Sequence, residues 1–161
     1  LAGCGQGEQT VDYVDSQGDE RSLRVEDNGG KRTVTSEDGL ISAKGTQGGS
    51  QARFPAYAPQ YPGARVQSAV DMTSGTAATG GVKQHTITQL TPDAPEAVMA
   101  FYRDKAGAAG KRVQDIKGGA SPMLVIGGTS LSDMEAAVTV TPAPSGGTSV
   151  NVTVQERLPR Q

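Results

Sequence analysis

The most reactive side chain in this sequence belongs to its single cysteine, Cys4, which follows Leu1, Ala2 and Gly3. A cysteine thiolate is the strongest side-chain nucleophile available for acyl-type transfer. The small residues Ala2 and Gly3 allow the backbone to lie extended in the groove of a protease. These four residues therefore have the types that a cleavage and modification site requires.

The run Leu1-Ala2-Gly3-Cys4 resembles the lipobox of bacterial lipoproteins, where a signal peptidase cuts ahead of a lipid-modified cysteine. The resemblance implies a diacylglyceryl thioether on Cys4 and an amide-linked acyl chain on its amino group. Two or three acyl chains anchor a protein stably, because each buried CH₂ contributes about 0.8 kcal/mol. The alternative is a free cysteine that carries no lipid.

The same resemblance implies a signal peptide and a place in the bacterial cell envelope, facing the periplasm. Because Gly5 rather than Asp follows the cysteine, analogy with lipoprotein sorting in enteric bacteria favours the outer membrane over the inner one. The expected partner of Cys4 is therefore a membrane, reached through lipid.

Little else in the sequence points to chemistry. The only histidine, His85, has no second His or Cys beside it to complete a metal or catalytic set. No Gly-x-Ser-x-Gly elbow and no phosphate-binding loop occurs. Adjacent carboxylates such as Glu37 and Asp38 lie in turn-like sequence, where solvent is expected to keep their pKa values ordinary. We therefore expect no catalytic residues, no metal, no cofactor and a protein that is not an enzyme.

Composition narrows the class of protein further. The chain has 161 residues, with 15 Lys and Arg against 17 Asp and Glu. This balance argues against a nucleic-acid partner, which would need a basic face. Hydrophobic residues make up 35%, and Gly and Pro contribute 22 and 9 residues. We therefore expect one core of about 100 residues beside a loosely folded remainder. No apolar run approaches the roughly 20 residues of a membrane-spanning helix.

The first third is poor in large apolar side chains. We expect residues 5–22 to be a flexible, solvated tether that holds the folded part away from the lipid headgroups. Residues 23–51 carry short strand patterns separated by turns that contain Gly, and end in a linker rich in Gly. These patterns are typical of a small β-meander or of the first strands of a stack of hairpins, which either packs on the next domain or remains mobile.

Residues 52–157 are expected to form an α+β domain, followed by a tail at 158–161. The Pro- and Tyr-rich run Phe54–Ala64 predicts an extended segment that lays its rings on the core and ends in a turn at Pro62-Gly63. Such a run can also be a ligand for a module that binds polyproline helices.

The clearest element is a helix that begins near Pro95. Asp93 and Glu96 have the spacing of a capping box, and Gly110 is expected to end the helix in a left-handed conformation. The expected buried stripe consists of Ala94, Val98, Phe101, Tyr102, Lys105 and Ala109.

Alternating apolar residues predict six strands around this helix, with a loop of small residues at 73–81. The strands are expected at 64–72, 82–90, 111–116, 122–126, 135–141 and 149–156. The order is thus β-β-α-β-β-β-β. The expected fold is an antiparallel sheet of about five to six strands packed on one helix, preceded by the tether and the small β-meander.

Two runs, Tyr61-Pro62-Gly63-Ala64 and residues 95–103, resemble a group of small uncharacterised bacterial envelope proteins. Their shared features are the extended Tyr-Pro-Gly-Ala segment, one helix bearing Phe-Tyr and a closing hairpin. The resemblance covers roughly residues 55–156. It implies fold and location only, because no activity can be carried over from the group.

Two functional hypotheses remain. The first is a lipid-anchored, non-enzymatic binding or structural module that offers a partner its polar sheet face or its aromatic segment. That partner would be an envelope protein, a glycan or a lipid, and the candidate contact residues are Tyr57, Tyr61 and His85. The second is a periplasmic carrier of a small apolar ligand, or an envelope enzyme with a site built from scattered residues. A deep pocket in which Tyr57, Tyr61, His85 or Tyr102 converge would favour the second.

Overall fold

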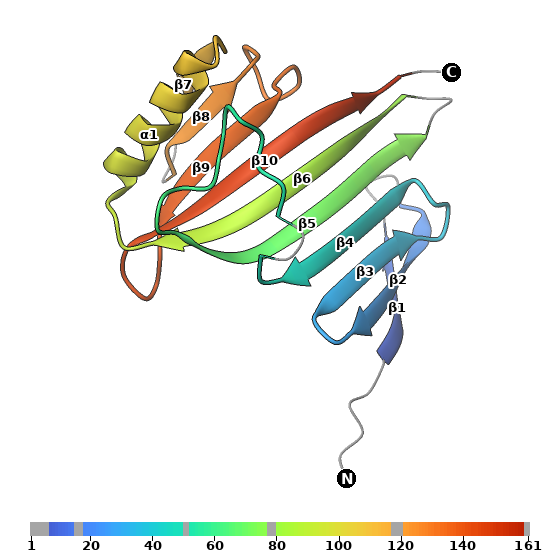
Figure 1. Ribbon diagram of the computed structural model, residues 1–161. Helices are drawn as coiled ribbons and strands as arrows, with labels where there is room; N and C mark the ends of the chain where they lie inside the picture. Colours follow the sequence, from blue (N-terminus) through green and yellow to red (C-terminus); the bar gives the residue numbers. More distant parts are fainter. Residues whose placement is uncertain (1–6, 15–17, 50–51, 77–79, 117–120, 160–161) are drawn as a thin grey trace.

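The computed structural model describes residues 7–14, 18–49, 52–76, 80–116 and 121–159. It contains one antiparallel sheet of ten strands and one helix, α1 (Figure 1). The elements are β1 (Gly7–Val14), β2 (Glu20–Asn28), β3 (Lys31–Ser36), β4 (Ile41–Gln47), β5 (Arg65–Thr76), β6 (Gly80–Thr91), α1 (Pro95–Ala108), β7 (Val113–Ile116), β8 (Met123–Ile126), β9 (Ala136–Pro142) and β10 (Thr148–Leu158). Across the sheet the strands lie in the order β1-β2-β3-β4-β5-β6-β10-β9-β8-β7.

The expectation of a sheet of five to six strands packed on one helix is wrong, because the N-terminal strands belong to the same sheet. Strand β5 pairs with β6 on one side and with β4 on the other, from Ile41 opposite Ser74 to Gln47 opposite Ser68. Strands β3, β2 and β1 follow outward. Residues 7–14, expected to be part of a tether, thus form the edge strand β1.

The error has a physical cause. The number of strands in the sheet was inferred from apolar side chains. A ladder of backbone hydrogen bonds, however, satisfies N–H and C=O groups whatever the side chains are. Residues 73–76 show the same effect. They were expected to lie in a loop of small residues, yet they continue β5 opposite residues 80–83 of β6.

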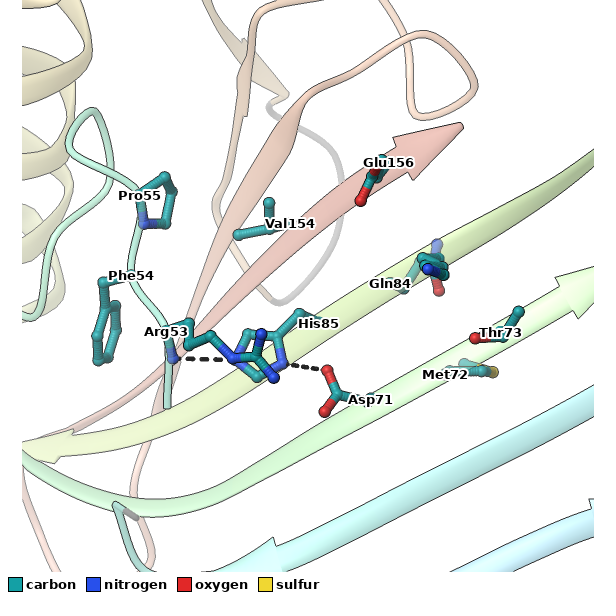
Figure 2. A pocket seen from close by; sticks show the side chains of 11 residues that line it. Arg53, Phe54, Pro55, Asp71, Met72, Thr73, Gln84, His85, Val154 and Glu156 are labelled. Carbon is teal, nitrogen blue, oxygen red and sulfur yellow. Dashed lines mark hydrogen bonds and ion pairs between the residues drawn. The ribbon is translucent and has the colours of Figure 1, made fainter. Parts of the chain in front are cut away.

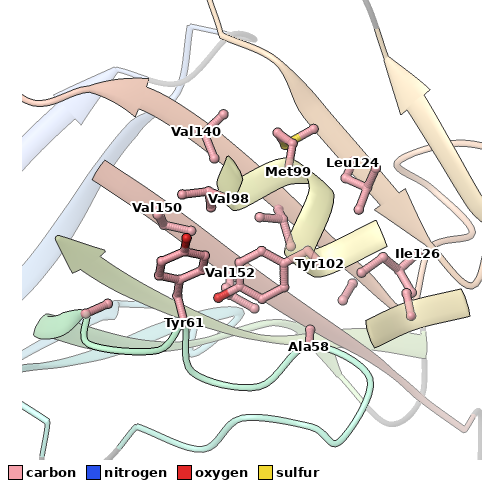
Figure 3. Close-up of a cluster of buried hydrophobic side chains, with 14 residues drawn as sticks. Ala58, Tyr61, Val98, Met99, Tyr102, Leu124, Ile126, Val140, Val150 and Val152 are labelled. Carbon is pink, nitrogen blue, oxygen red and sulfur yellow. The ribbon is translucent and has the colours of Figure 1, made fainter. Parts of the chain in front are cut away.

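The hydrophobic core lies on one face of strands β10, β9 and β8. Helix α1 contributes Val98, Tyr102 and Ala106, and the segment before β5 contributes Ala58 and Tyr61 (Figure 3). The sheet side of this core consists of the buried residues Leu124, Ile126, Ala136, Val138, Val140, Val150 and Val152. The helix contacts β7, β8 and β9, so it covers only the C-terminal end of the sheet (Figure 1).

The N-terminal end of the helix differs from the expectation, whereas the C-terminal end agrees with it. Ala94 is the N-cap residue and no side chain caps it, so the capping box is wrong. Asp93 instead accepts a hydrogen bond of 2.7 Å from the Tyr61 hydroxyl. At the C-terminus the prediction is confirmed, because Gly110 has a φ of 70° and ends the helix.

The buried face of the helix is also rotated from the expected stripe. Val98, Met99, Tyr102 and Ala106 are buried. Phe101 is only half-buried, and the remaining expected members Ala94, Lys105 and Ala109 are exposed. The helix therefore presents Met99 and Ala106 to the sheet, whereas the expected Lys105 and Ala109 lie on its outer side.

The predicted turn at Pro62-Gly63 is confirmed. The N–H of Ala64 donates to the carbonyl of Tyr61 at 3.0 Å, and Gly63 has a φ of 72°. Proline followed by a glycine at positive φ is the pattern of a type II turn. The turn leads the chain from the core into β5.

Strands β1–β4 form a single layer, with neither the helix nor the segment 52–64 over them (Figure 1). Cross-strand pairs such as Val11 with Leu23 and Val25 with Val34 place apolar side chains on the face opposite the helix. We call this row the apolar band; it consists of Val11, Tyr13, Leu23, Val25, Val34, Ile41, Ala43 and Met72. At the far end of the same face, Val125, Met134 and Ala137 form a small buried cluster of their own.

Candidate functional site

A hollow formed by the described residues lies beside the core, on the helix-bearing face of β5, β6 and β10. Its volume is about 550 Å³. Residues Arg53, Phe54 and Pro55 lie over the strands and form one wall, while Asp71, His85 and Val154 rise from the sheet (Figure 2). Because the cross-strand register places Asp71 opposite His85 and His85 opposite Val154, the floor of the hollow follows directly from strand pairing.

The imidazole of His85 is held at both ring nitrogens. The backbone N–H of Arg53 donates to Nε2 at 3.1 Å, and Nδ1 lies 2.5 Å from Oδ1 of Asp71 (Figure 2). A backbone N–H can only donate, so Nε2 must be the acceptor and Nδ1 must carry the proton that Asp71 accepts. Neither nitrogen is left to take a proton from a substrate or to ligate a metal. No sequence pattern marks this pair, because Asp71 and His85 are separated by 14 positions.

The rest of the hollow is lined by charges of both signs. Arg53 and Lys83 lie with Asp71 and Glu156 around Phe54 and the other apolar side chains. Charged groups on the wall of a cavity disfavour an apolar ligand, because they lose hydration without gaining a partner. The hollow thus has the size of a small-molecule site but not the lining that a carrier of apolar ligands needs.

A second polar arrangement lies inside the core, beneath the Tyr-Pro-Gly-Ala segment. Gln89 of β6 is fully buried; its Oε1 accepts from the N–H of Tyr61 at 3.0 Å and its Nε2 donates to the hydroxyl of Tyr102 at 2.9 Å. Burial raises the pKa of Tyr102 to about 12. The hydrogen bond to Asp93 is the main reason that the pKa of Tyr61 is also raised. These groups join the segment to the sheet and the helix, and they keep both phenols neutral.

The candidate contact residues named from the sequence lie in different surroundings. Tyr61 is 7% exposed and stacks edge-on against Phe101, with ring centroids 5.1 Å apart. Tyr57 is half-buried, with the Nζ of Lys111 5.1 Å from its ring centroid. His85 lines the hollow described above. The structure does not bring the three together, and Tyr102 belongs to the core. Cys4, the expected lipidation site, lies outside the described residues.

One expectation about carboxylates needs correction. The pKa of Asp38 was expected to be ordinary, yet it is lowered, chiefly by a hydrogen bond of 2.6 Å from the Ser36 hydroxyl and also by the N–H of Leu40. Asp133, which the sequence did not single out, has a pKa lowered to about 2 by the hydroxyl and N–H of Ser130 and by Thr129. Asp133 binds groups of its own loop, and Asp38 binds its own turn and also Arg21 of β2 at 2.9 Å, so both carboxylates hold local structure together.

The apolar band is the feature that sequence reasoning missed most clearly. Four of its side chains are strongly exposed: Val11 by 43%, Tyr13 by 36%, Ile41 by 40% and Met72 by 39%. The band crosses five adjacent strands, β1 to β5. Apolar and polar residues alternate within β2 and β3, and this was visible in the sequence. Only the register shows that the apolar positions of five strands line up on one face.

Within the described residues no group of three or more His, Cys, Asp or Glu could hold a metal ion. The helix in the described part of the chain is neither long nor apolar enough to cross a membrane. No family model, curated protein or solved structure matches this chain. The functional argument therefore rests on the residues and their geometry.

Proposed function

We propose that this chain is a lipid-anchored, non-enzymatic binding or structural module of the bacterial cell envelope, facing the periplasm and more consistent with the outer membrane than the inner one. The anchor rests on the lipobox pattern at Leu1 to Cys4. A diacylated or triacylated cysteine supplies the two or more chains that stable attachment requires.

The apolar band is the observation that carries the binding role. Large exposed apolar patches on soluble domains mark interaction sites, and this one lies on the sheet face opposite the helix. Apolar aliphatic side chains suit a protein surface better than a glycan, whose hydroxyls would lose water without replacement. Between a protein and a glycan, the band therefore favours a protein.

The geometry of His85 supports a role without catalysis. Its two nitrogens are engaged by Arg53 and Asp71, and the hollow around it carries no second group that would activate a nucleophile. The interaction fixes β5, β6 and the segment before β5 relative to one another. In this proposal the hydrogen-bonded pair of Asp71 and His85 has a structural role.

The anchor is tested by replacing Cys4 with Ser and separating membranes from the soluble periplasmic fraction. The Cys4→Ser protein is expected in the soluble fraction, with its circular dichroism unchanged. A variant that still sediments with membranes after a salt wash would show that lipid on Cys4 is not what attaches the protein.

The binding surface is tested with a photo-crosslinking amino acid placed at two neighbouring positions of β3 in intact cells. Val34 lies in the apolar band, whereas the side chain of Thr33 points to the other face. Adducts are expected from position 34 and not from position 33. Equal adducts from both positions, or none from position 34, would remove the band as the binding surface.

A further inference from the structure

The two edges of the sheet are protected very differently. Strand β7 has four residues, and α1 packs against it. Strand β1 has eight residues, all of them exposed, and no strand lies beyond it in the described part of the chain. It contains no Pro and no Lys, the residues that commonly protect an edge from pairing. The edge at β1 is therefore open to another strand.

The pairing pattern shows which backbone groups of β1 are free to bond. The N–H of Glu37 donates to the carbonyl of Ser22 at 3.2 Å, so the backbone of Ser22 points toward β3. Because backbone groups alternate in direction along a strand, Leu23 and the other odd-numbered residues of β2 point toward β1. Val11 pairs with Leu23, so the odd residues of β1 bond inward. The outward groups are those of Glu8, Thr10, Asp12 and Val14.

We propose that β1 pairs antiparallel with β1 of a second copy of this chain, with Val11 on the two-fold axis, so that the two sheets join into one. In this register Thr10 lies opposite Asp12 of the other copy and Glu8 lies opposite Val14. All four outward-facing residues of each strand then form ladder bonds, and Val11 faces its own counterpart.

Charge selects this register over its neighbours. A shift that centres the axis on Thr10 would place Glu8 directly opposite Asp12 twice, and a shift to Asp12 would place that carboxylate opposite itself. Like charges directly across a ladder are destabilising. In the proposed register Glu8 keeps its ion pair of 2.9 Å with Arg24 on its own copy and meets an apolar residue across the axis.

Continuity of the apolar band supports a second copy as the occupant. The band ends at β1 with Val11 and Tyr13, which are 43% and 36% exposed. Pairing centred on Val11 continues the row without a break into the band of the other copy.

This pairing does not depend on the lipid anchor. The two-fold axis is perpendicular to the sheet, so Gly7 of one copy and Gly7 of the other lie at the same height along the axis.

Disulfide formation tests the register, because Cys4 is the only native cysteine and a Cys4→Ser chain has no thiol. In a non-hydrogen-bonded antiparallel pair the Cα atoms are about 4.5 Å apart, within the roughly 4.4–6.8 Å that a disulfide spans. Val11→Cys in this background is expected to crosslink into a covalent dimer on mild oxidation. Tyr13→Cys is the matched control on the same strand and face, since residue 13 and its counterpart would lie about 14 Å apart.

Mixing provides a second check of the same register. Gln9→Cys and Tyr13→Cys chains, each unable to crosslink alone, are expected to crosslink when combined, because residue 9 lies opposite residue 13 of the other copy. Crosslinking of Val11→Cys no faster than Tyr13→Cys would overturn the proposal. Faster crosslinking at Thr10→Cys than at Val11→Cys would overturn the register and with it the two-fold axis on Val11.

Two further changes separate edge pairing from random collision. Thr10→Pro removes an outward N–H and leaves the inward bonds to β2 in place, which edge strands tolerate. Added to Val11→Cys, it is expected to reduce crosslinking to the level of Tyr13→Cys. Val11→Lys, at an exposed position, is expected to abolish any dimer in sedimentation of the Cys4→Ser chain. A dimer that survives Val11→Lys would contradict the proposal even if Thr10→Pro disturbs β1.

Discussion

The side-chain amide of Gln89 donates a hydrogen bond of 2.9 Å to the hydroxyl of Tyr102, and both residues are completely buried. The same amide accepts from the N–H of Tyr61. A single polar side chain of β6 therefore connects the helix, the sheet and the segment that leads into β5. A buried polar group with all its partners present rigidifies a core, whereas one that loses a partner is costly.

Replacing Gln89 with Leu should destabilise the protein by about 2–4 kcal/mol, because the N–H of Tyr61 and the hydroxyl of Tyr102 would both lose a partner. Tyr102→Phe, which removes one of these groups, should cost about 1–2 kcal/mol. Urea unfolding measures both. Gln60→Leu is the control, since Gln60 is exposed and its side-chain amide donates to the carbonyl of Ala64 at the surface. Equal costs at positions 60 and 89 would contradict the role assigned to Gln89.

The aromatic residues of the helix should differ in their contribution to stability. Tyr102 is fully buried, so Tyr102→Ala should cost about 3–5 kcal/mol. Phe101 was expected from its spacing to be core, but it is half-buried, edge-on to Tyr61 and Tyr102, with Lys105 over its ring. Phe101→Ala should therefore cost less, about 1.5–3 kcal/mol. Thermal melts that rank the two variants in the opposite order would show that the helix is rotated from this position.

Periodicity and turn chemistry predicted the elements that bury apolar residues, but not those that pair only through their backbone. The turn at Pro62-Gly63 and the end of the helix at Gly110 were predictable because each needs a particular backbone conformation that glycine adopts easily. Strand β1 was not predictable, because Gly7–Val14 buries no side chain and its order depends on β2 being adjacent. The Asp71–His85 pair was equally hidden, since its two residues meet only through the β5–β6 register.

The loop around Asp133 should show its structure in an acid titration. Hydrogen bonds from Ser130 and Thr129 lower the pKa of this carboxyl to about 2, from the 3.8 of an unperturbed aspartate. A depressed pKa in the folded state means that the loop is stabilised above about pH 4 and loses this contribution as the pH falls toward 2. Carbon-13 NMR of the Asp133 carboxyl should give the low midpoint. In Ser130→Ala the midpoint should rise, and an unchanged midpoint would show that Ser130 does not stabilise the carboxylate.

The two halves of the sheet should differ in local stability, and amide hydrogen exchange would show it. Strands β8, β9 and β10 carry the core under the helix, whereas β1 to β3 have one layer and water on both faces. Opening an outer strand breaks backbone bonds but exposes little apolar surface, so it should occur far more often than global unfolding. When the Cys4→Ser chain is dilute enough to be monomeric, the amides of β1 to β3 should exchange first. Val34→Ala should cost under about 1 kcal/mol against about 1.5–3 kcal/mol for Val152→Ala. Protection of β1 should then rise with protein concentration, because a second copy occupies its free edge. If it is protected equally at all concentrations, the ten strands unfold as one unit and the single layer is as stable as the core.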